Sequence, residues 1–305
     1  MINPAYILLY HGVTDTSPAG IENFSGKHIK KSEFENHMQF LSENCNTVSL
    51  REMSNSLSSN VKNPDKYVSV TFDDTFRNIY DVAFPILKKY NIPATFFITT
   101  GMIDSDKMFW VDQLERMINF SKSDIVHVKI PKSERLLIRT RSEKIYAVNI
   151  IKSFLKASPT LIREKTLEDI RSQVGKLEKN TEKNYENLTS DQIREISDTP
   201  GYEIGGHTVS HEILSYLPEE RLVYEIEHCI ELLSNITGKP IDLFSYPEGQ
   251  LHHFNSQVIQ KLKISGISVC PSAVDGVNYP GSNPFYLKRI MVGFMGKKFP
   301  FDLTK

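Results

Sequence analysis

The chain has 305 residues, of which 40% are hydrophobic and 24% charged, an ordinary composition for a globular protein. Its 36 basic and 37 acidic residues give a formal net charge of −1, so no basic excess supports binding to nucleic acid. Cys45, Cys229 and Cys270 are odd in number and form no CxxC pair, which argues against a disulfide framework or a structural zinc site. No leader-like start and no run of about 18 apolar residues is present. We therefore expect a cytoplasmic protein without a membrane span, although removal of a leader would leave the same start.

The first third of the chain alternates apolar runs with segments of helical period. The predicted strands are residues 6–10, 67–72 and 93–99. Helices are predicted at residues 32–41 and 78–90. Pro85 should kink the second helix, because proline lacks the N–H group that the helical ladder needs.

Residues 121–187 differ from the rest of the chain in being rich in Lys, Glu, Ser and Ile. A hairpin is predicted at residues 126–130 and 136–140, and helices are predicted at residues 142–156 and 160–179. We interpret this segment as a mainly helical insertion within a single catalytic domain spanning residues 1–305. It either shapes a pocket or is a solvated decoration, since charged helices commonly just face water.

The alternation of strands and helices resumes after the insertion. Helices are predicted at residues 190–197, 218–236 and 255–262, and strands at residues 202–205, 243–246, 267–270 and 286–291. Strands separated by helices imply mostly parallel pairing with right-handed crossovers. About seven parallel strands suffice for a closed or incomplete (β/α) barrel, and an open doubly wound sheet would give the same pattern. In either layout the site should lie at the carboxyl ends of the strands.

Two polar clusters follow predicted strands. Asp73 and Asp74 come directly after residues 67–72, where one carboxylate can bind a metal ion while the other accepts a proton from water. His207 and His211 follow two glycines after residues 202–205, and a spacing of four brings both imidazoles to one face if the segment is helical. Each pattern alone is weak, because a loop turn or a helix cap gives the same residues. Their shared position after strands favours a metal site.

A third segment, Phe244-Ser245-Tyr246-Pro247-Glu248-Gly249, also lies where a strand meets a loop. In order, the three segments read TFDDT at 71–75, HTVSH at 207–211 and SYPEG at 245–249. This set resembles the polysaccharide deacetylases, the family that shares the NodB homology domain (carbohydrate esterase family 4), whose motifs read TFDDG, H-[ST]-x-x-H and usually R-x-P-x-G. The stretches 10–13, 83–97, 109–110 and 244–247 also look like bacterial members linked to surface-sugar biosynthesis.

The resemblance implies a distorted, incomplete (β/α) barrel that binds one divalent metal ion through Asp74, His207 and His211. Zinc is favoured, with cobalt, nickel and iron as alternatives, because imidazole–carboxylate sites accept several ions. It further implies that Asp73 is the general base that activates the metal-bound water. The backbone N–H of Tyr246, together with the metal, would stabilise the oxyanion while an N-acetyl group is removed from an amino sugar in a polysaccharide or glycan precursor.

The chain departs from the family pattern at three points. Thr75 replaces the usual glycine, and Ser245 stands where many members have an arginine that orients the base. Arg289 or Arg77 is a candidate replacement for that arginine. No histidine occurs after His253, so the family's late general acid is absent.

Two residues are candidates to replace the missing acid, and three are candidates to bind substrate. His11 at the end of the first strand, or Asp73 returning its proton, would protonate the leaving amine. The candidate substrate-binding residues are Trp110, Tyr246 and Arg289. Trp110, the only tryptophan, can stack on a sugar ring or anchor the insertion.

Two alternatives to N-deacetylation stay open at this point. A sugar O-acetylesterase or a deformylase would use the same site on a different scissile group. A catalytically silent carbohydrate-binding protein of the same fold would explain the missing acid, although both histidines and both aspartates are present.

Overall fold

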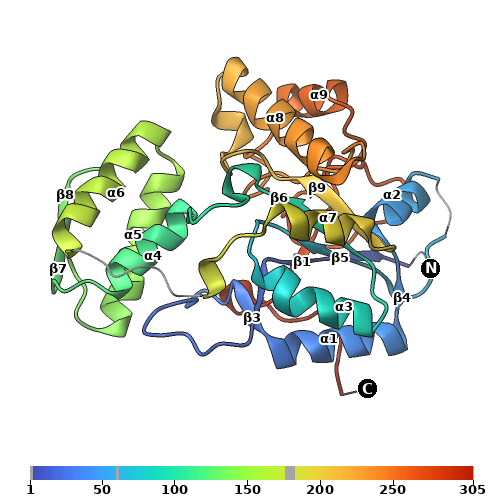
Figure 1. Ribbon diagram of the computed structural model, residues 1–305, viewed down its shortest axis with the longest axis horizontal. Coiled ribbons are helices and arrows are strands. Elements are labelled where there is room, and N and C mark those ends of the chain that lie inside the picture. Colours follow the sequence, from blue (N-terminus) through green and yellow to red (C-terminus); the bar gives the residue numbers. More distant parts are fainter. Residues whose placement is uncertain (1–2, 60–61, 176–182, 305) are drawn as a thin grey trace. The chain divides into compact units, whose positions relative to one another are not determined.

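The computed structural model describes residues 3–59, 62–175 and 183–304. The chain divides into two compact units, the first made of residues 1–15, 25–106 and 186–305 and the second of residues 16–24 and 107–185. Figure 1 shows both units, with strands and helices alternating along most of the first. The second unit contains more of the chain than the predicted insertion at 121–187, and the assignment of residues 1–305 to a single catalytic domain stays a prediction.

A parallel sheet organises the first unit. Its strands follow the order β10-β1-β5-β6-β9, and β4 also pairs with β5. The bounds are β1 Ala5–Tyr10, β4 Asn46–Thr47, β5 Tyr67–Phe72, β6 Ala94–Ile98, β9 Tyr202–Gly206 and β10 Ile290–Met291. Every residue of β5 and β6 is buried, as expected for parallel strands covered on both faces.

Helices cover this sheet and pack into apolar cores, most of them into the largest one. They are α1 Lys31–Asn44, α2 Leu50–Ser58, α3 Phe84–Lys89, α7 Ser190–Asp198, α8 Glu219–Thr237 and α9 Ser256–Ile264. A small parallel pair, β2 Gly12–Thr14 and β3 His28–Lys30, lies before α1. Phe34, Phe72 and Phe96 are among the buried aromatic side chains that join these layers.

Short bridges continue the sheet beyond β9. Gly206 pairs in parallel with Phe244, and Leu243 pairs in parallel with Val269. The N–H of Ser272 then donates to the carbonyl of Leu287 (2.8 Å), next to β10. These bridged and hydrogen-bonded segments lead from β9 round to β10, which pairs with β1. The fold is therefore a distorted (β/α) barrel, as the sequence predicted.

The strands predicted at 243–246, 267–270 and 286–291 are much shorter than expected. The first is reduced to isolated bridges at Leu243 and Phe244, the second to one bridge at Val269, and the third contributes only Ile290–Met291. Pro271 and Pro284 lie in this part of the chain, where a residue without an N–H group cannot donate to a strand ladder.

The helical segment changes type just before Pro85, with helical φ and ψ at Ala83 and Phe84, and the kink expected at Pro85 stays a prediction. A single π-helical turn, Ile79–Ala83, precedes α3, and Pro85 lies in the first turn of α3. Proline is tolerated there because the first N–H groups of a helix have no partner within the helix.

The second unit has its own apolar core, built from a hairpin and three helices. These elements are α4 Trp110–Asn119, β7 Ile125–Lys129, β8 Ser133–Leu137, α5 Arg141–Lys156 and α6 Thr160–Val174. The second hairpin strand lies earlier than predicted, because a short turn at Pro131 sets the antiparallel register Ile125↔Leu137. The predicted helix 160–179 ends at Val174, before Gly175 with its φ of 83°, and residues 176–179 lie outside the described residues.

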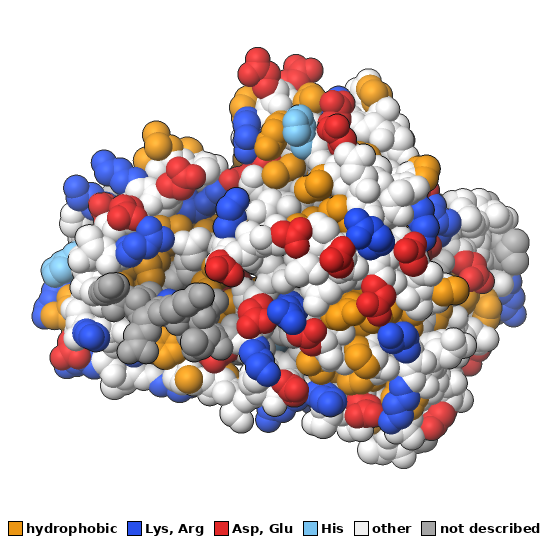
Figure 2. Space-filling model, viewed as in Figure 1, with side chains coloured by type: hydrophobic (Ala, Val, Ile, Leu, Met, Phe, Trp, Pro, Cys, Tyr) orange, Lys and Arg blue, Asp and Glu red, His pale blue; other side chains and the backbone are white. Residues whose placement is uncertain are grey.

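Charges of both signs are interspersed on the face shown in Figure 2, in keeping with the near-zero net charge. In the part of the chain that the structure describes, no helix has the length and apolarity required to cross a membrane.

Candidate active site

The two adjacent carboxylates lie at a sharp turn after β5. The N–H of Asp73 donates to the carbonyl of Tyr10 (3.0 Å), so the pairing with β1 extends to this residue. Asp74 has a φ of 75°, in the left-handed region that residues other than glycine rarely adopt. This turn, rather than the alternation of a strand, lets both carboxylates face His207: one oxygen of each lies 3.9 Å from Nε2 of its ring.

Thr75, which replaces the usual glycine of the motif, ties this turn to the end of β6. Its hydroxyl donates to the carbonyl of Thr99 and accepts from the N–H of the same residue, both at 2.9 Å. Thr75 is fully buried. The departure from the family motif therefore adds a link between two neighbouring strand ends.

The two histidines do not lie on a helix, which corrects the conditional expectation from their spacing. His207 continues β9, with its N–H donating to the carbonyl of Ile98 (2.9 Å), and an irregular loop follows. Thr208 and His211 have φ values of 68° and 58°, which turn the backbone back on itself. The two rings meet with centroids 4.9 Å apart.

Gly205 and Gly206, the two glycines before His207, make room for core side chains. A Cβ on Gly205 would lie 2.6 Å from the ring of Phe97, and one on Gly206 would lie 2.6 Å from the ring of Phe244. The close approach is thus between neighbouring strands.

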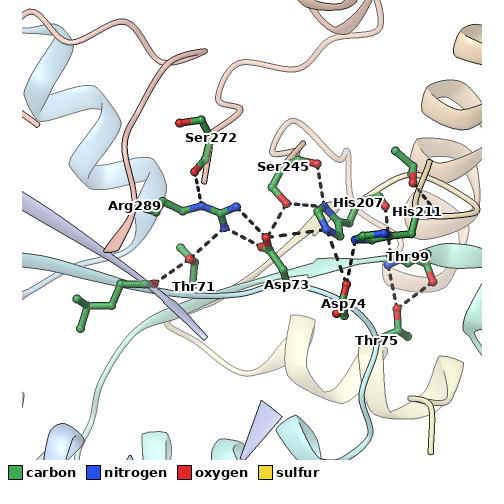
Figure 3. A network of polar contacts seen from close by, with 12 residues as sticks. Thr71, Asp73, Asp74, Thr75, Thr99, His207, His211, Ser245, Ser272 and Arg289 are labelled. Carbon is green, nitrogen blue, oxygen red and sulfur yellow. Dashed lines mark hydrogen bonds and ion pairs between the residues drawn. The ribbon is translucent and has the colours of Figure 1, made fainter. Parts of the chain in front are cut away.

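Asp74, His207 and His211 form the group of potential metal ligands found within the described residues. Each offers one ligand atom, and these atoms lie within 4.8 Å of one another. The Nε2 atom of His211 is 3.3 Å from Oδ1 of Asp74 (Figure 3). Nδ1 of His207 lies 2.9 Å from the carbonyl oxygen of Ser245, so it carries the proton and the lone pair of Nε2 faces the cluster.

Asp73 is held by a buried arginine from just before β10. The guanidinium of Arg289 donates to both carboxylate oxygens of Asp73, each at 2.7 Å. Its Nε donates to the carbonyl of Ser272 (2.7 Å), and its side chain has no exposure to solvent. The hydroxyl of Ser245 also donates to Asp73, at 3.3 Å (Figure 3).

These contacts place the two carboxylates in opposite electrostatic environments. Burial alone would raise the pKa of Asp73, but the Arg289 guanidinium and His207 lower it to about 2. Burial raises the pKa of Asp74, against the attraction of His11. Burial also lowers the pKa of His207, which favours the neutral imidazole that a metal ion requires. Divergent pKa values in neighbouring carboxylates are typical of active sites.

The other candidate residues lie in different settings. Arg289, predicted to bind substrate, is fully buried against Asp73, whereas Arg77 forms exposed ion pairs with Asp81 and Glu186. Of these two arginines, Arg289 is the one that contacts Asp73.

His11 directly follows β1, and both Asp73 and Asp74 attract its protonated form. Its Nδ1 atom is buried and has no hydrogen-bond partner within the described ranges. The phenol of Tyr246, a second candidate for substrate binding, is only 1% exposed and donates to the carbonyl of Phe285 (3.2 Å). Trp110 belongs to the second unit, where it packs against the core and lies beside Arg163.

Sequence reasoning missed the role of Ser245 as a partner of His207 and Asp73. The signal in the sequence is its place in the third motif, where serine replaces the usual arginine. The backbone carbonyl oxygen of Ser245 lies 2.9 Å from Nδ1 of His207, and its hydroxyl, which only serine supplies here, lies 2.7 Å from the same atom.

A family model for polysaccharide deacetylases matches residues 60–125 and 175–269, which together make up more than half of the chain. The chain belongs to this family. The matched segments contain all three motifs and the metal-ligand group. A poly-β-1,6-N-acetyl-D-glucosamine N-deacetylase of Staphylococcus aureus is 32% identical over 126 residues, which are 37% of this chain and 42% of that protein. The chain spans about two fifths of the length of the curated relatives it matches.

Solved structures of deacetylases share the fold of this family member. The Streptococcus pyogenes deacetylase PplD matches 98% of this chain and 96% of its own, with a TM-score of 0.63 and 19% identity. IcaB from Ammonifex degensii matches 95% of this chain and 92% of its own, with a TM-score of 0.59 and 19% identity. The likeness extends over nearly the whole chain and supports the barrel assignment.

Proposed function

We propose that this deacetylase-family protein is a metal-dependent hydrolase that removes the N-acetyl group from an amino sugar in a polysaccharide or glycan precursor. The observation that carries the proposal is the convergence of Asp74, His207 and His211 beside Asp73. Three protein ligands next to a separate carboxylate form the open pattern of hydrolytic metal sites, in which one position is left for a reactant.

The residues of the cluster fit a divalent cation. Oδ1 of Asp74 is buried, and no hydrogen-bond donor reaches it among the described residues. A buried carboxylate in that position needs a positive partner, which a bound cation provides. Such a cation, for which zinc is our first choice over cobalt, nickel or iron, supplies Lewis acidity that polarises an acyl oxygen and acidifies water.

Asp73 is the group that we assign to proton abstraction. With a pKa of about 2 it is a carboxylate at neutral pH, so it can accept a proton from water. Its two hydrogen bonds to Arg289 fix the plane of the carboxylate, and Oδ2 lies 3.9 Å from Nε2 of His207, facing the cluster. Arg289 is thus a positioning residue for Asp73.

The backbone N–H of Tyr246 is the proposed donor to the oxyanion. Among the hydrogen bonds of the described residues, none uses this N–H. It adjoins Ser245, which contacts both His207 and Asp73. A donor fixed next to the reacting group stabilises the developing negative charge without reorganisation.

The proton for the leaving amine comes from His11 or from Asp73, and pH dependence distinguishes them. Burial lowers the pKa of His11 below 6.5, so a donating imidazolium would be lost as the pH rises through that lowered value. If His11 is the donor, kcat/KM should fall with rising pH in this range, and His11→Gln should abolish this limb. A profile unchanged by His11→Gln would assign the proton to Asp73.

The amino-sugar substrate class rests on the family and on the named activity of the Staphylococcus aureus relative. The test is to screen acetylated amino sugars and their β-linked oligomers for acetate release, with enzyme stripped by a chelator and then reloaded with zinc. We expect release of a free amine only from the reloaded enzyme. Release of a free hydroxyl instead would indicate an O-acetylesterase, formate release would indicate a deformylase, and zinc binding without any turnover would favour a silent carbohydrate-binding protein.

A further inference from the structure

A buried glutamate on α8 lies against the loop that contains both histidines. Glu225 has no exposure to solvent, and it is not among the potential metal ligands found within the described residues. One of its oxygens accepts from the backbone N–H groups of Val209 and Ser210, both at 2.8 Å. The other accepts from the hydroxyl of Ser210 (2.9 Å) and from the guanidinium of Arg221 (2.8 Å).

The two N–H groups that donate to Glu225 belong to the middle of the 207–211 loop. The loop bends so tightly that two of its five residues, Thr208 and His211, have positive φ values. Such backbone conformations are costly for residues other than glycine and persist only where the surroundings enforce them. Within the loop, the N–H of His211 donates to the hydroxyl of Thr208 (2.8 Å).

The opposite side of the loop is fixed by backbone groups that follow β6. The N–H groups of Thr100 and Gly101 donate to the carbonyls of Thr208 and Val209, at 3.0 and 2.8 Å. A Cβ on Gly101 would lie only 2.5 Å from the carbonyl oxygen of Val209, so this contact depends on glycine. The loop is therefore held by carbonyl contacts on one side and by the carboxylate of Glu225 on the other.

We infer that Glu225 is a positioning residue that holds His211 in register with Asp74 and His207, and so sets the metal affinity of the site. Residues behind metal ligands commonly change metal affinity by about 10- to 100-fold when they are removed. Glu225 differs from the usual case because it acts on the backbone of the ligand loop rather than on a histidine ring. The inference rests on the proposed metal site.

The test measures zinc affinity by titration calorimetry, with zinc ions as the only ligand, together with the thermal unfolding of the metal-free protein. We expect Glu225→Ala to weaken zinc binding by about tenfold or more, because two backbone N–H groups of the loop lose their acceptor. Glu225→Gln keeps one acceptor oxygen at nearly the same volume. Its zinc affinity should therefore lie between that of the wild type and that of Glu225→Ala.

Two control variants separate positioning from general stability. Arg221→Ala removes the exposed partner of Glu225 and leaves the loop contacts in place, so zinc affinity should change by less than about threefold. Leu233→Ala creates a cavity in the apolar core under the same helix, about two turns from Glu225, and should lower thermal stability while leaving zinc affinity unchanged.

The outcomes distinguish the inference from the proposed function. If the wild type binds zinc and both Glu225 variants bind it within threefold of the wild type, Glu225 has no positioning role and the metal site stands. The inference also fails if Leu233→Ala weakens zinc binding as much as Glu225→Ala does. If the wild type itself does not bind zinc, the metal site and the inference fall together. Should Glu225→Ala not fold, the comparison of Glu225→Gln with Leu233→Ala decides.

Discussion

Breaking the pair between Asp73 and Arg289 should destabilise the metal-free protein by several kcal/mol. Both side chains are almost completely buried, and two hydrogen bonds of 2.7 Å join them. The depression of the Asp73 pKa from 3.8 to about 2 corresponds to about 2.4 kcal/mol in favour of the charged carboxylate. Arg289→Met removes this stabilisation and leaves a buried charge without its partner, for which losses of about 3–5 kcal/mol are typical.

The pH dependence of this contribution has a definite direction. Because the folded-state pKa of Asp73 lies below that of the unfolded chain, the pair stabilises the protein fully above pH 3.8, and this stabilisation is lost as the pH falls through about 2. The difference in unfolding free energy between the wild type and Arg289→Met should therefore be largest at neutral pH and shrink in strong acid.

Urea unfolding at pH 7 with a chelator present measures this coupling through a double-mutant cycle of Arg289→Met and Asp73→Asn. We expect a coupling energy of about 2 kcal/mol or more, because each single variant leaves one buried charge without its partner, whereas the double variant leaves no charge at either position. Arg77→Met, which breaks exposed pairs only, is the matched control and should cost less than about 1 kcal/mol. A coupling energy near zero would refute the assignment of Arg289 to Asp73.

Three further changes test separate parts of the structure. Asp73→Asn should retain one equivalent of zinc by metal analysis and lose turnover by about 100-fold or more, whereas full activity would remove Asp73 from the base role. His37→Phe should make stability less sensitive to acid, because burial lowers the pKa of His37 to about 4. Between pH 7 and pH 4.5, His37 should cost the wild type about 2 kcal/mol of unfolding free energy that the variant does not lose. Urea unfolding of both proteins at the two pH values measures this difference, and equal losses would show that His37 is irrelevant. Trp110→Ala should raise KM for oligomeric substrates with little change in kcat if the indole stacks on sugar, while unchanged steady-state kinetics would restrict Trp110 to packing.

The sequence predicted the position of the site because the chemistry follows strand ends. Asp73, Asp74 and His207 each directly follow a strand of the parallel sheet, and in such a sheet the carboxyl ends of neighbouring strands lie together. Three short motifs, read in order, were therefore enough to indicate which residues form the group of potential metal ligands and which carboxylate lies beside it.

Backbone geometry and distant partners were less predictable. A spacing of four between His207 and His211 suggested a helix, but positive φ values at Thr208 and His211 give a tight loop instead, and the letters of the motif do not encode φ. Glu225 is an ordinary member of a helical pattern in the sequence. Only the packing of α8 on the loop shows that its carboxylate accepts from that loop.

The positions of Asp73 and Arg289 in the chain limit when their ion pair can form during folding. Asp73 and Arg289 are 216 residues apart, and Arg289 directly precedes the last strand of the sheet. Because synthesis proceeds from the N-terminus, a growing polypeptide contains the carboxylate long before its guanidinium partner has been made. A nascent chain can thus form β1, β5 and β6 early, but Asp73 can be neutralised by Arg289 only after translation of residue 289. Formation of the buried ion pair between Asp73 and Arg289 should then be among the latest steps of folding.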